Sequence, residues 1–177
     1  MARRWVIADL HLDDERIIAY TNRPFIDAKN MNKSLVQNWN SIVDKDDTVY
    51  VLGDFTVSKK YRKIKKWCSK LNGRKILILG KNDKASIHTY LKAGFIEVTS
   101  KPILLEPRLT LMCEPPKFED IWFRMFYIFG RVHNVECDAD KFGNCAGVSA
   151  ERVNYTPVDL DKLIDVLDPC RGPEYGD

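Results

Sequence analysis

The run RWVIADLH, residues 4–11, decides the fold, because a short apolar stretch passes directly into an acid and an imidazole. Its strand-forming residues predict a buried strand over residues 4–9. Two later runs have the same form, TVYVLGD at 48–54 and KILILGKND at 75–83. They predict buried strands over 48–52 and 75–79, each followed by polar residues.

Helical periodicity fills the intervals between these strands. Apolar residues recur at helical spacing over 31–43 and 59–71, and a shorter helix is predicted over 86–92. The chain after residue 95 predicts a hairpin (103–105 and 109–112), strands at 126–129 and 146–153, and a closing helix at 159–167. This order favours an α/β sandwich with sheet at its centre. We expect one domain over residues 1–167 and a tail over 168–177.

The composition excludes several classes of protein. Of 177 residues, 45% are hydrophobic and 30% charged, which is typical of a globular chain and not of a disordered one. Five cysteines without CxxC spacing indicate neither a disulfide scaffold nor a zinc knuckle, so we expect a reducing, cytoplasmic location. No stretch is long enough to span a bilayer, and no membrane partner is expected. Homo-oligomer formation stays open.

The charge distribution has one irregular region. The formal net charge is +3, too small to indicate a nucleic-acid partner. Residues 59–75 nevertheless hold nine basic residues and no acidic one. This stretch is either a nucleic-acid patch or the solvated face of an amphipathic helix. Its apolar stripe favours the second interpretation.

Polar residues follow four of the predicted strands and include candidate metal ligands. Asp9 and His11 follow the first strand and Asp54 the second, while His133 follows the strand at 126–129. In open α/β sheets, residues at the carboxyl ends of strands converge on one crevice. Two Asp and two His are suitable ligands for Mn, Fe or Zn.

Taken in order, these blocks resemble the calcineurin-like metallophosphoesterases, in their small single-domain bacterial and phage branch. The family pattern is D-x-H, G-D, G-N-H-D, a lone His and G-H-x-H. The flanks at 22–25 and 151–158 also match that branch. The resemblance implies a four-layer α/β/β/α sandwich and a two-metal phosphoesterase site. The matching blocks here are Asp9-Leu10-His11, Gly53-Asp54, Gly80-Lys81-Asn82-Asp83, Cys113 and Gly130-Arg131-Val132-His133.

The resemblance implies one complete metal site and one altered site. The ligands of one family metal match Asp9, His11, Asp54 and His133, and all four are present. The second metal shares Asp54, but its other ligand positions hold Lys81, Cys113 and Arg131. The family's catalytic His matches Asn82. Charged Lys and Arg cannot ligate a metal.

Two of these assignments have alternatives. A one-residue shift would put Asn82 at the family's metal-binding Asn, with Asp83 following it. Cys113 follows a strand, and we favour its interpretation as a small buried side chain over that of a ligand.

We therefore expect one divalent metal ion (Mn, Fe, Zn or Mg) and no second metal. Lys81 and Arg131 would replace the charge of the second ion and bind a phosphate or phosphoester ligand. With Asn82 they are the candidate catalytic residues. The expected function is phosphoester hydrolysis that is weak or lost. A working single-metal phosphoesterase or phosphodiesterase, and a phosphate- or nucleotide-binding regulatory protein, stay open. A pure scaffold is disfavoured, because burying two Asp and two His together is costly.

Overall fold

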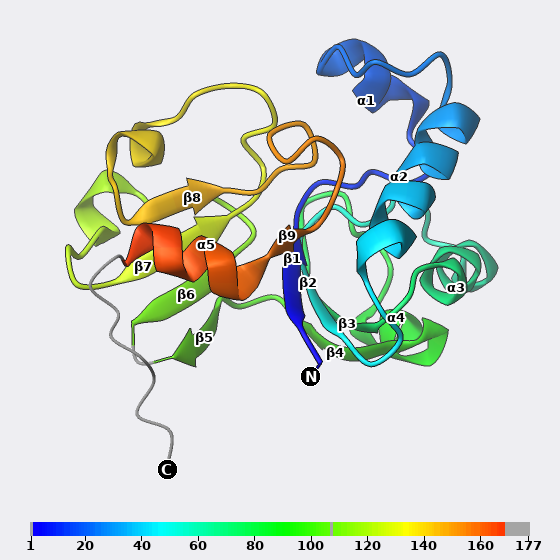
Figure 1. The fold of residues 1–177 in the computed structure, drawn as a ribbon. Helices are drawn as coiled ribbons and strands as arrows, with labels where there is room; N and C mark the ends of the chain where they lie inside the picture. The colour runs from blue at the N-terminus through cyan, green and yellow to red at the C-terminus, as the bar shows by residue number, and fades with distance from the viewer. Residues whose placement is uncertain (1, 107, 169–177) are drawn as a thin grey trace.

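The computed structural model describes residues 2–106 and 108–168, and two β-sheets form its centre (Figure 1). In the first sheet, β1 to β4 pair in parallel in the order β4-β3-β2-β1, and β9 adds an antiparallel edge. In the second sheet, of order β5-β6-β7-β8, β5 is antiparallel to β6 and the other pairs are parallel. The strands are β1 Arg4–Ile7, β2 Thr48–Leu52, β3 Arg74–Ile78, β4 Phe95–Thr99, β5 Ile103–Glu106, β6 Leu109–Met112, β7 Phe126–Phe129, β8 Cys145–Gly147 and β9 Val158–Asp159.

The α-helices other than the last one, α5, cover one face of the first sheet, and the second sheet covers the other (Figure 1). Alternation along β1 divides it between the two cores: Trp5 and Ile7 pack with the helices, and Val6 packs between the sheets. Both faces are therefore buried, which explains the nearly continuous apolar runs. The helices are α1 Glu15–Tyr20, α2 Ala28–Ile42, α3 Tyr61–Lys70, α4 Ile87–Ala93 and α5 Leu160–Leu167, with 3-10 helices η1 Phe118–Asp120 and η2 Asp138–Lys141.

The outer face of the second sheet has a thinner cover. Leu160 and Ile164 of α5 belong to the core between the sheets. The cluster on the outer face is formed by Phe129, Val132 and Ala139 with partly buried neighbours, and no residue of an α-helix in the described ranges belongs to it. The α/β fold with two mixed sheets thus agrees with a metallophosphoesterase-like sandwich, but η2 and loops stand where a fourth, helical layer was expected.

Most predicted elements are confirmed, including the antiparallel hairpin of β5 and β6. The predicted strand over 146–153 is wrong in its extent, because β8 ends at Gly147. There the chain leaves the second sheet and bonds to the end of β1, through Ala8 N to Val148 O (2.9 Å) and Ala150 N to Ala8 O (2.9 Å). Strand β4 was not predicted, although its sequence FIEVT is rich in strand-forming residues; only Phe95 in it is buried. The predicted tail, apart from Asp168, lies outside the described residues.

No helix in the described residues combines the length and the apolar sequence that a bilayer crossing requires.

Candidate metal centre

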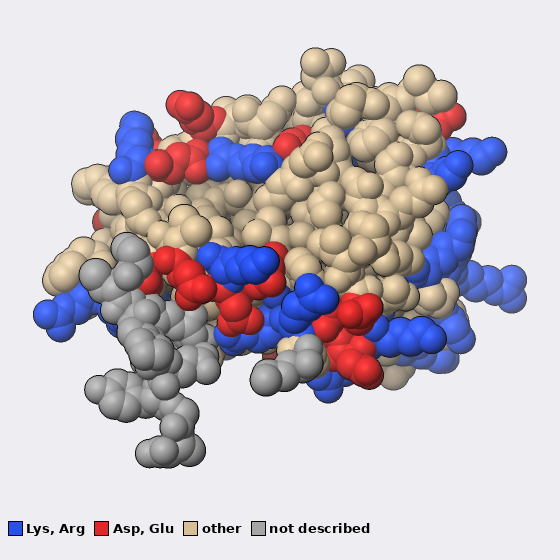
Figure 2. All heavy atoms as spheres, viewed as in Figure 1, with Lys and Arg blue, Asp and Glu red and all other residues tan. Residues whose placement is uncertain are grey.

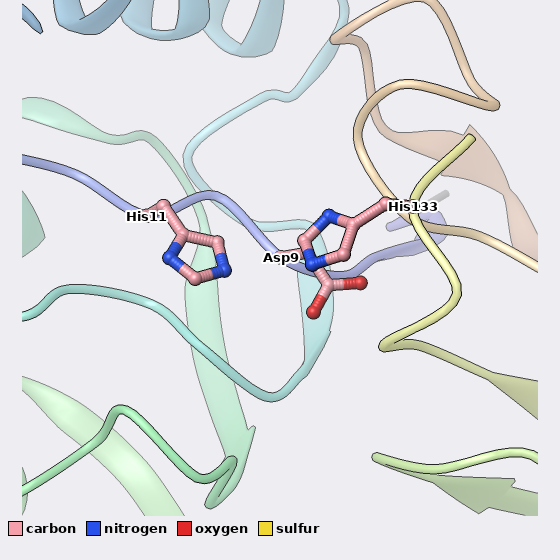
Figure 3. Close-up of side chains that lie close together, drawn as sticks. All are labelled: Asp9, His11 and His133. Atoms are coloured by element: carbon pink, nitrogen blue, oxygen red, sulfur yellow. The ribbon is translucent and has the colours of Figure 1, made fainter. Parts of the chain in front are cut away.

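Three side chains converge at the carboxyl end of the first sheet. One ligand atom from each of Asp9, His11 and His133 lies within 4.8 Å of the others. Figure 3 shows the two imidazoles and the carboxylate facing a common space, with Asp9 and His11 coming from the end of β1 and His133 from the segment after β7. Asp54, after β2, is adjacent: its Oδ2 lies 3.4 Å from His11 Nε2. The structure therefore brings the four predicted ligands together, three of them in one cluster.

The backbone at these residues adopts an unusual conformation. Asp9, His11, Asp54 and His133 have φ of 57°, 52°, 52° and 47°. Left-handed φ is uncommon for residues other than glycine, and such strain concentrates at functional sites. Loop hydrogen bonds hold it in place, including Asp9 N to Gly53 O (3.1 Å) and His11 N to Asp54 O (2.8 Å). The loops after β1 and β2 thus stay paired beyond the strands and turn their polar side chains toward one point.

Close backbone approaches explain two glycines of the motifs. A Cβ atom at Gly130 would lie 2.5 Å from the Leu52 carbonyl oxygen, and one at Gly80 would lie 2.5 Å from the Asp54 backbone nitrogen. Real Cβ atoms do not approach this closely. Glycine therefore lets the loops after β3 and β7 come close to the candidate ligands.

His11 carries the clearest sign of a metal-binding role. Its side chain is buried, and neither Nδ1 nor Nε2 has a hydrogen-bond partner. The nearest carboxylate oxygens are at 3.5 Å (Asp14, from Nδ1) and 3.4 Å (Asp54, from Nε2). Buried polar groups without partners are rare and costly, and each one calls for an explanation. Imidazole nitrogens with a nearby carboxylate fit a divalent ion such as Zn, Fe or Mn.

A chain of contacts behind the site fixes the orientation of His133. Its Nδ1 lies 3.0 Å from Glu151 Oε1, which also accepts a hydrogen bond from Arg23 Nε (2.9 Å). Arg23 is buried and donates to the carbonyl oxygens of Asp9 (2.7 Å) and Leu10 (3.1 Å). Because Nδ1 is engaged with a carboxylate, Nε2 of His133 is the nitrogen left for a ligand.

The sequence reasoning did not assign roles to Arg23 and Glu151. Both lie in flanking blocks that match the family branch, 22–25 and 151–158, and that match was the only available signal. The pairing joins residues 128 positions apart, so local patterns could not predict it.

The charges of the site follow from these contacts. Burial opposes ionisation of Asp54, but its contacts with His11 and Asn82 outweigh burial and lower its pKa to about 2. Burial also opposes ionisation of Glu151, whose pKa His133 and Arg23 lower to about 2. For His133, burial favours the neutral form, but Glu151 and Asp9 raise its pKa overall. Burial raises the pKa of Asp9, so of the two candidate ligand carboxylates it is Asp54 that these contacts keep in the ionised form that a cation binds.

The altered positions form a second half of the site with its own internal partners. Arg131, Cys113 and exposed Lys81 line a small hollow that Asp9 and Asp54 also border. The Arg131 backbone N–H donates to Asp9 Oδ2 (2.6 Å), and its guanidinium forms an ion pair with Glu114.

The side chains at two other altered positions, Cys113 and Asn82, make their contacts within the protein. Cys113 packs against the core between the sheets, and burial raises the pKa of its thiol. Asn82 donates to Asp54 twice, from its backbone nitrogen (2.7 Å) and from its side-chain amide (2.8 Å).

Asp83 stabilises the loop after β3, which also contains Asn82. Its carboxylate accepts hydrogen bonds from Phe55 N (3.0 Å), Gly80 N (3.0 Å) and Tyr90 Oη (3.2 Å). Asp83 thereby ties the loops after β2 and β3 together, and burial raises its pKa to about 6.

A larger cavity of about 450 Å³ opens beside His133. Its walls are partly polar and partly apolar, and they include Tyr20, Thr21, Arg131, Asn134 and Val135. The cavity is large enough for a small organic group, and it adjoins both the metal-ligand cluster and Arg131.

Comparisons with known sequences identify a close relative without an assigned activity. No protein-family model matches the chain. The chain is 33% identical over 173 residues to the uncharacterised protein MJ1445 of Methanocaldococcus jannaschii, covering 95% of this chain and 93% of that one. A second match, 36% identical over 85 residues, covers 47% of this chain and 41% of the Gene 66 protein of Mycobacterium phage L5.

Two solved structures share the fold. AQ665 of Aquifex aeolicus, a protein of unknown function, superposes with a TM-score of 0.74 at 23% identity and covers 94% of this chain and 100% of its own. Pseudomonas putida nuclease MPE superposes with a TM-score of 0.51 at 20% identity and covers 74% of this chain and 62% of its own. At these identities the likeness extends to the fold alone.

Proposed function

The chain belongs to the same family as protein MJ1445 of Methanocaldococcus jannaschii, and from its Asp/His cluster we propose that it binds one divalent metal ion and hydrolyses phosphoesters slowly. The observation that carries this proposal is His11. Its two buried nitrogens lack partners, yet it stands beside Asp9, His133 and Asp54. A buried histidine with only a structural role would be expected to have a hydrogen-bond partner in the protein.

The roles of the residues follow from their chemistry. Asp9, His11 and His133, with Asp54 beside them, would hold the ion. A bound divalent ion supplies positive charge for the phosphoryl oxygens. Arg131 and Lys81, at the rim of the hollow, are donors suited to a phosphate anion. The cavity beside His133 would receive the organic group of the ester.

The altered half supports slow rather than rapid hydrolysis. Besides Asp54, the family's second-metal ligand positions hold Lys81, Cys113 and Arg131, and Arg131 already pairs with Glu114. The double contact of Asn82 with Asp54 supports the shifted alignment, in which Asn82 takes the family's metal-binding Asn position. Even then two ligands of the second ion are replaced. Loss of one ion and of the catalytic His removes on the order of a thousandfold in rate.

A phosphodiester is the substrate class to test first, because one of the structures with this fold is called a nuclease. The experiment measures metal content and the hydrolysis of bis-p-nitrophenyl phosphate with added manganese. We expect about one equivalent of metal and slow turnover. His11→Ala and Asp54→Asn should lose turnover, and His11→Ala should also lose the metal.

His88→Ala is the matched control, because His88 lies exposed on α4, outside the metal cluster. It should leave metal content and turnover unchanged. Turnover that survives His11→Ala, or the absence of bound metal in the unaltered protein, would refute the proposal. Metal and phosphate binding without turnover would favour the regulatory alternative.

A further inference from the structure

The strongest unexplained charge on the molecule lies along α3. We call the exposed Lys and Arg side chains of residues 59–70 the basic face; there are seven of them. Figure 2 shows Lys and Arg gathered at the right-hand side of the molecule, where Figure 1 places α3. With the nine basic residues of 59–75 set aside, the rest of the chain has 19 basic against 25 acidic residues, a charge of −6. The modest net charge therefore hides a strong segregation.

The basic face works against the stability of its own helix. No side chain caps the start of α3, and its first turn holds no acidic residue, although the helix dipole favours negative charge there. Lys66 stands four positions from both Arg62 and Lys70, so like charges repel along the helix. The buried stripe of α3, with Ile64 and Trp67, explains why the helix folds but not why acids are absent.

The charges of the basic face are barely neutralised by the protein. In the described part of the chain, Lys63 is the one member within 4.0 Å of a carboxylate, at 3.8 Å from Asp13. Other members lie over aromatic rings, such as Lys66, 4.2 Å from the centre of Trp67. A ring contact leaves the positive charge in place and available to an anion.

The basic face adjoins the metal centre through Asp13. This residue lies two positions after His11 and accepts a hydrogen bond from Trp67 Nε1 (3.0 Å) in addition to its contact with Lys63. The helix has ten residues and is therefore about 15 Å long, enough to meet several successive phosphates of an extended strand. A polymer with one phosphate at the metal centre could thus place its neighbours over α3.

We propose that the basic face binds the phosphate backbone of a single-stranded nucleic acid and holds it beside the Asp9, His11 and His133 cluster. Delivery to the cluster rests on the proposed function, whereas the binding itself does not. A membrane is the weaker partner, because the apolar side chains of α3 are buried in the core and leave nothing to insert into a bilayer.

The test measures the binding of a fluorescently labelled mixed-sequence 20-nucleotide DNA strand by anisotropy, in EDTA and over a range of KCl. The binding constant should fall steeply as salt rises. The triple variant Lys59→Gln/Arg62→Gln/Lys66→Gln should bind at least about tenfold more weakly and lower the slope of log K against log salt by about two.

The control triple Lys29→Gln/Lys33→Gln/Lys45→Gln removes the same charge from exposed positions elsewhere and should change affinity less than about twofold. If both triple variants lose DNA affinity equally, the effect depends on net charge alone and the proposal is overturned. Absence of DNA binding at low salt, or binding only to phosphatidylserine vesicles, would also overturn it. Bis-p-nitrophenyl phosphate separates the two proposals: DNA binding without its hydrolysis removes the proposed function alone, and hydrolysis without DNA binding removes this inference alone.

Discussion

Asp54 lies between two halves of the site that differ in how their polar groups are paired. On one side, His11 is buried with both nitrogens unpaired, and it faces Asp9 and His133. On the other side, the guanidinium of Arg131 is paired with Glu114. The first half leaves both ring nitrogens of His11 without a hydrogen-bond partner among the described residues. The second half pairs its guanidinium charge within the protein.

The supports of the two halves differ in burial as well. Behind the first half, Arg23 and Glu151 form an ion pair whose side chains are 0% and 5% exposed. In the second half, the side chains of Arg131 and Glu114 are 37% and 54% exposed. Breaking a buried pair strands a charge in the interior, whereas an exposed charge is resolvated. The two pairs should therefore respond very differently to the same substitution.

The largest effect is expected from Glu151→Gln. It leaves the Arg23 guanidinium buried without a countercharge and should lower the free energy of unfolding by about 3–5 kcal/mol. Urea denaturation measures this loss, and metal affinity should fall as well because His133 loses its orienting carboxylate. Asp138→Asn, which removes an exposed carboxylate from a surface pair, should leave both unchanged. A loss under about 1 kcal/mol would show that the buried pair is not a support of the site.

The carboxylate of Asp47, at the opposite end of the first sheet, lies outside both halves of the site and serves as a reference for them. Asp47 is buried and accepts hydrogen bonds from Arg3 N (2.7 Å), Trp5 Nε1 (2.8 Å) and Asp44 N (3.0 Å). Burial alone would raise the pKa of Asp47, but these donors lower it below its ordinary value. Asp47→Asn should therefore cost about 2 kcal/mol at pH 7.

The stabilisation that Asp47 provides should decrease as the pH falls. A lowered pKa means that the folded protein holds the proton less tightly than the unfolded chain. The stabilisation by Asp47 is complete above the unfolded-state pKa of about 4 and disappears as the pH falls through the lower folded-state value. Denaturation of both proteins between pH 7 and pH 3 checks this. A difference that stays constant over the whole range would contradict it.

The part of this site that could be predicted is the part with a local signature. Apolar runs ending in Asp9 and Asp54 predict strands and place their polar ends at one sheet edge, because parallel strands end together. The Arg23–Glu151 pair has no such signature, since a contact across 128 positions follows from the completed fold. The early end of β8 is equally non-local, because it depends on bonds to Ala8.

The alignment of the Gly80 to Asp83 loop shows a different limit. Sequence order alone left open whether Lys81 or Asn82 faces Asp54, and the answer depends on the backbone path after β3. In the structure Asn82 contacts Asp54, and the Lys81 side chain is exposed.

Rebuilding the second half is the third prediction. The double variant Cys113→His/Arg131→His returns two family ligand types to the hollow, and histidine tolerates the left-handed φ of 69° at position 131. We expect a second equivalent of metal and at least about tenfold faster hydrolysis, equal to about 1.4 kcal/mol. The same double variant in an Asp54→Asn background should gain neither, because both halves share Asp54. A stoichiometry that stays at one would mean that the hollow is too small or too rigid for an ion.

The smallest effects are expected at the Arg131–Glu114 pair, where the sign is more informative than the size. Neither Arg131→Gln nor Glu114→Gln should change the free energy of unfolding by more than about 1 kcal/mol, because both side chains reach solvent. Their effects on inorganic phosphate binding, measured by calorimetry, should be opposite. Arg131→Gln removes a donor and weakens binding, whereas Glu114→Gln removes the internal competitor and strengthens it. If both variants weaken phosphate binding, the pair acts as one structural unit. If only Arg131→Gln weakens it, the guanidinium binds phosphate while it stays paired with Glu114. Opposite signs would show that the second half is closed by a carboxylate that an incoming phosphate can displace.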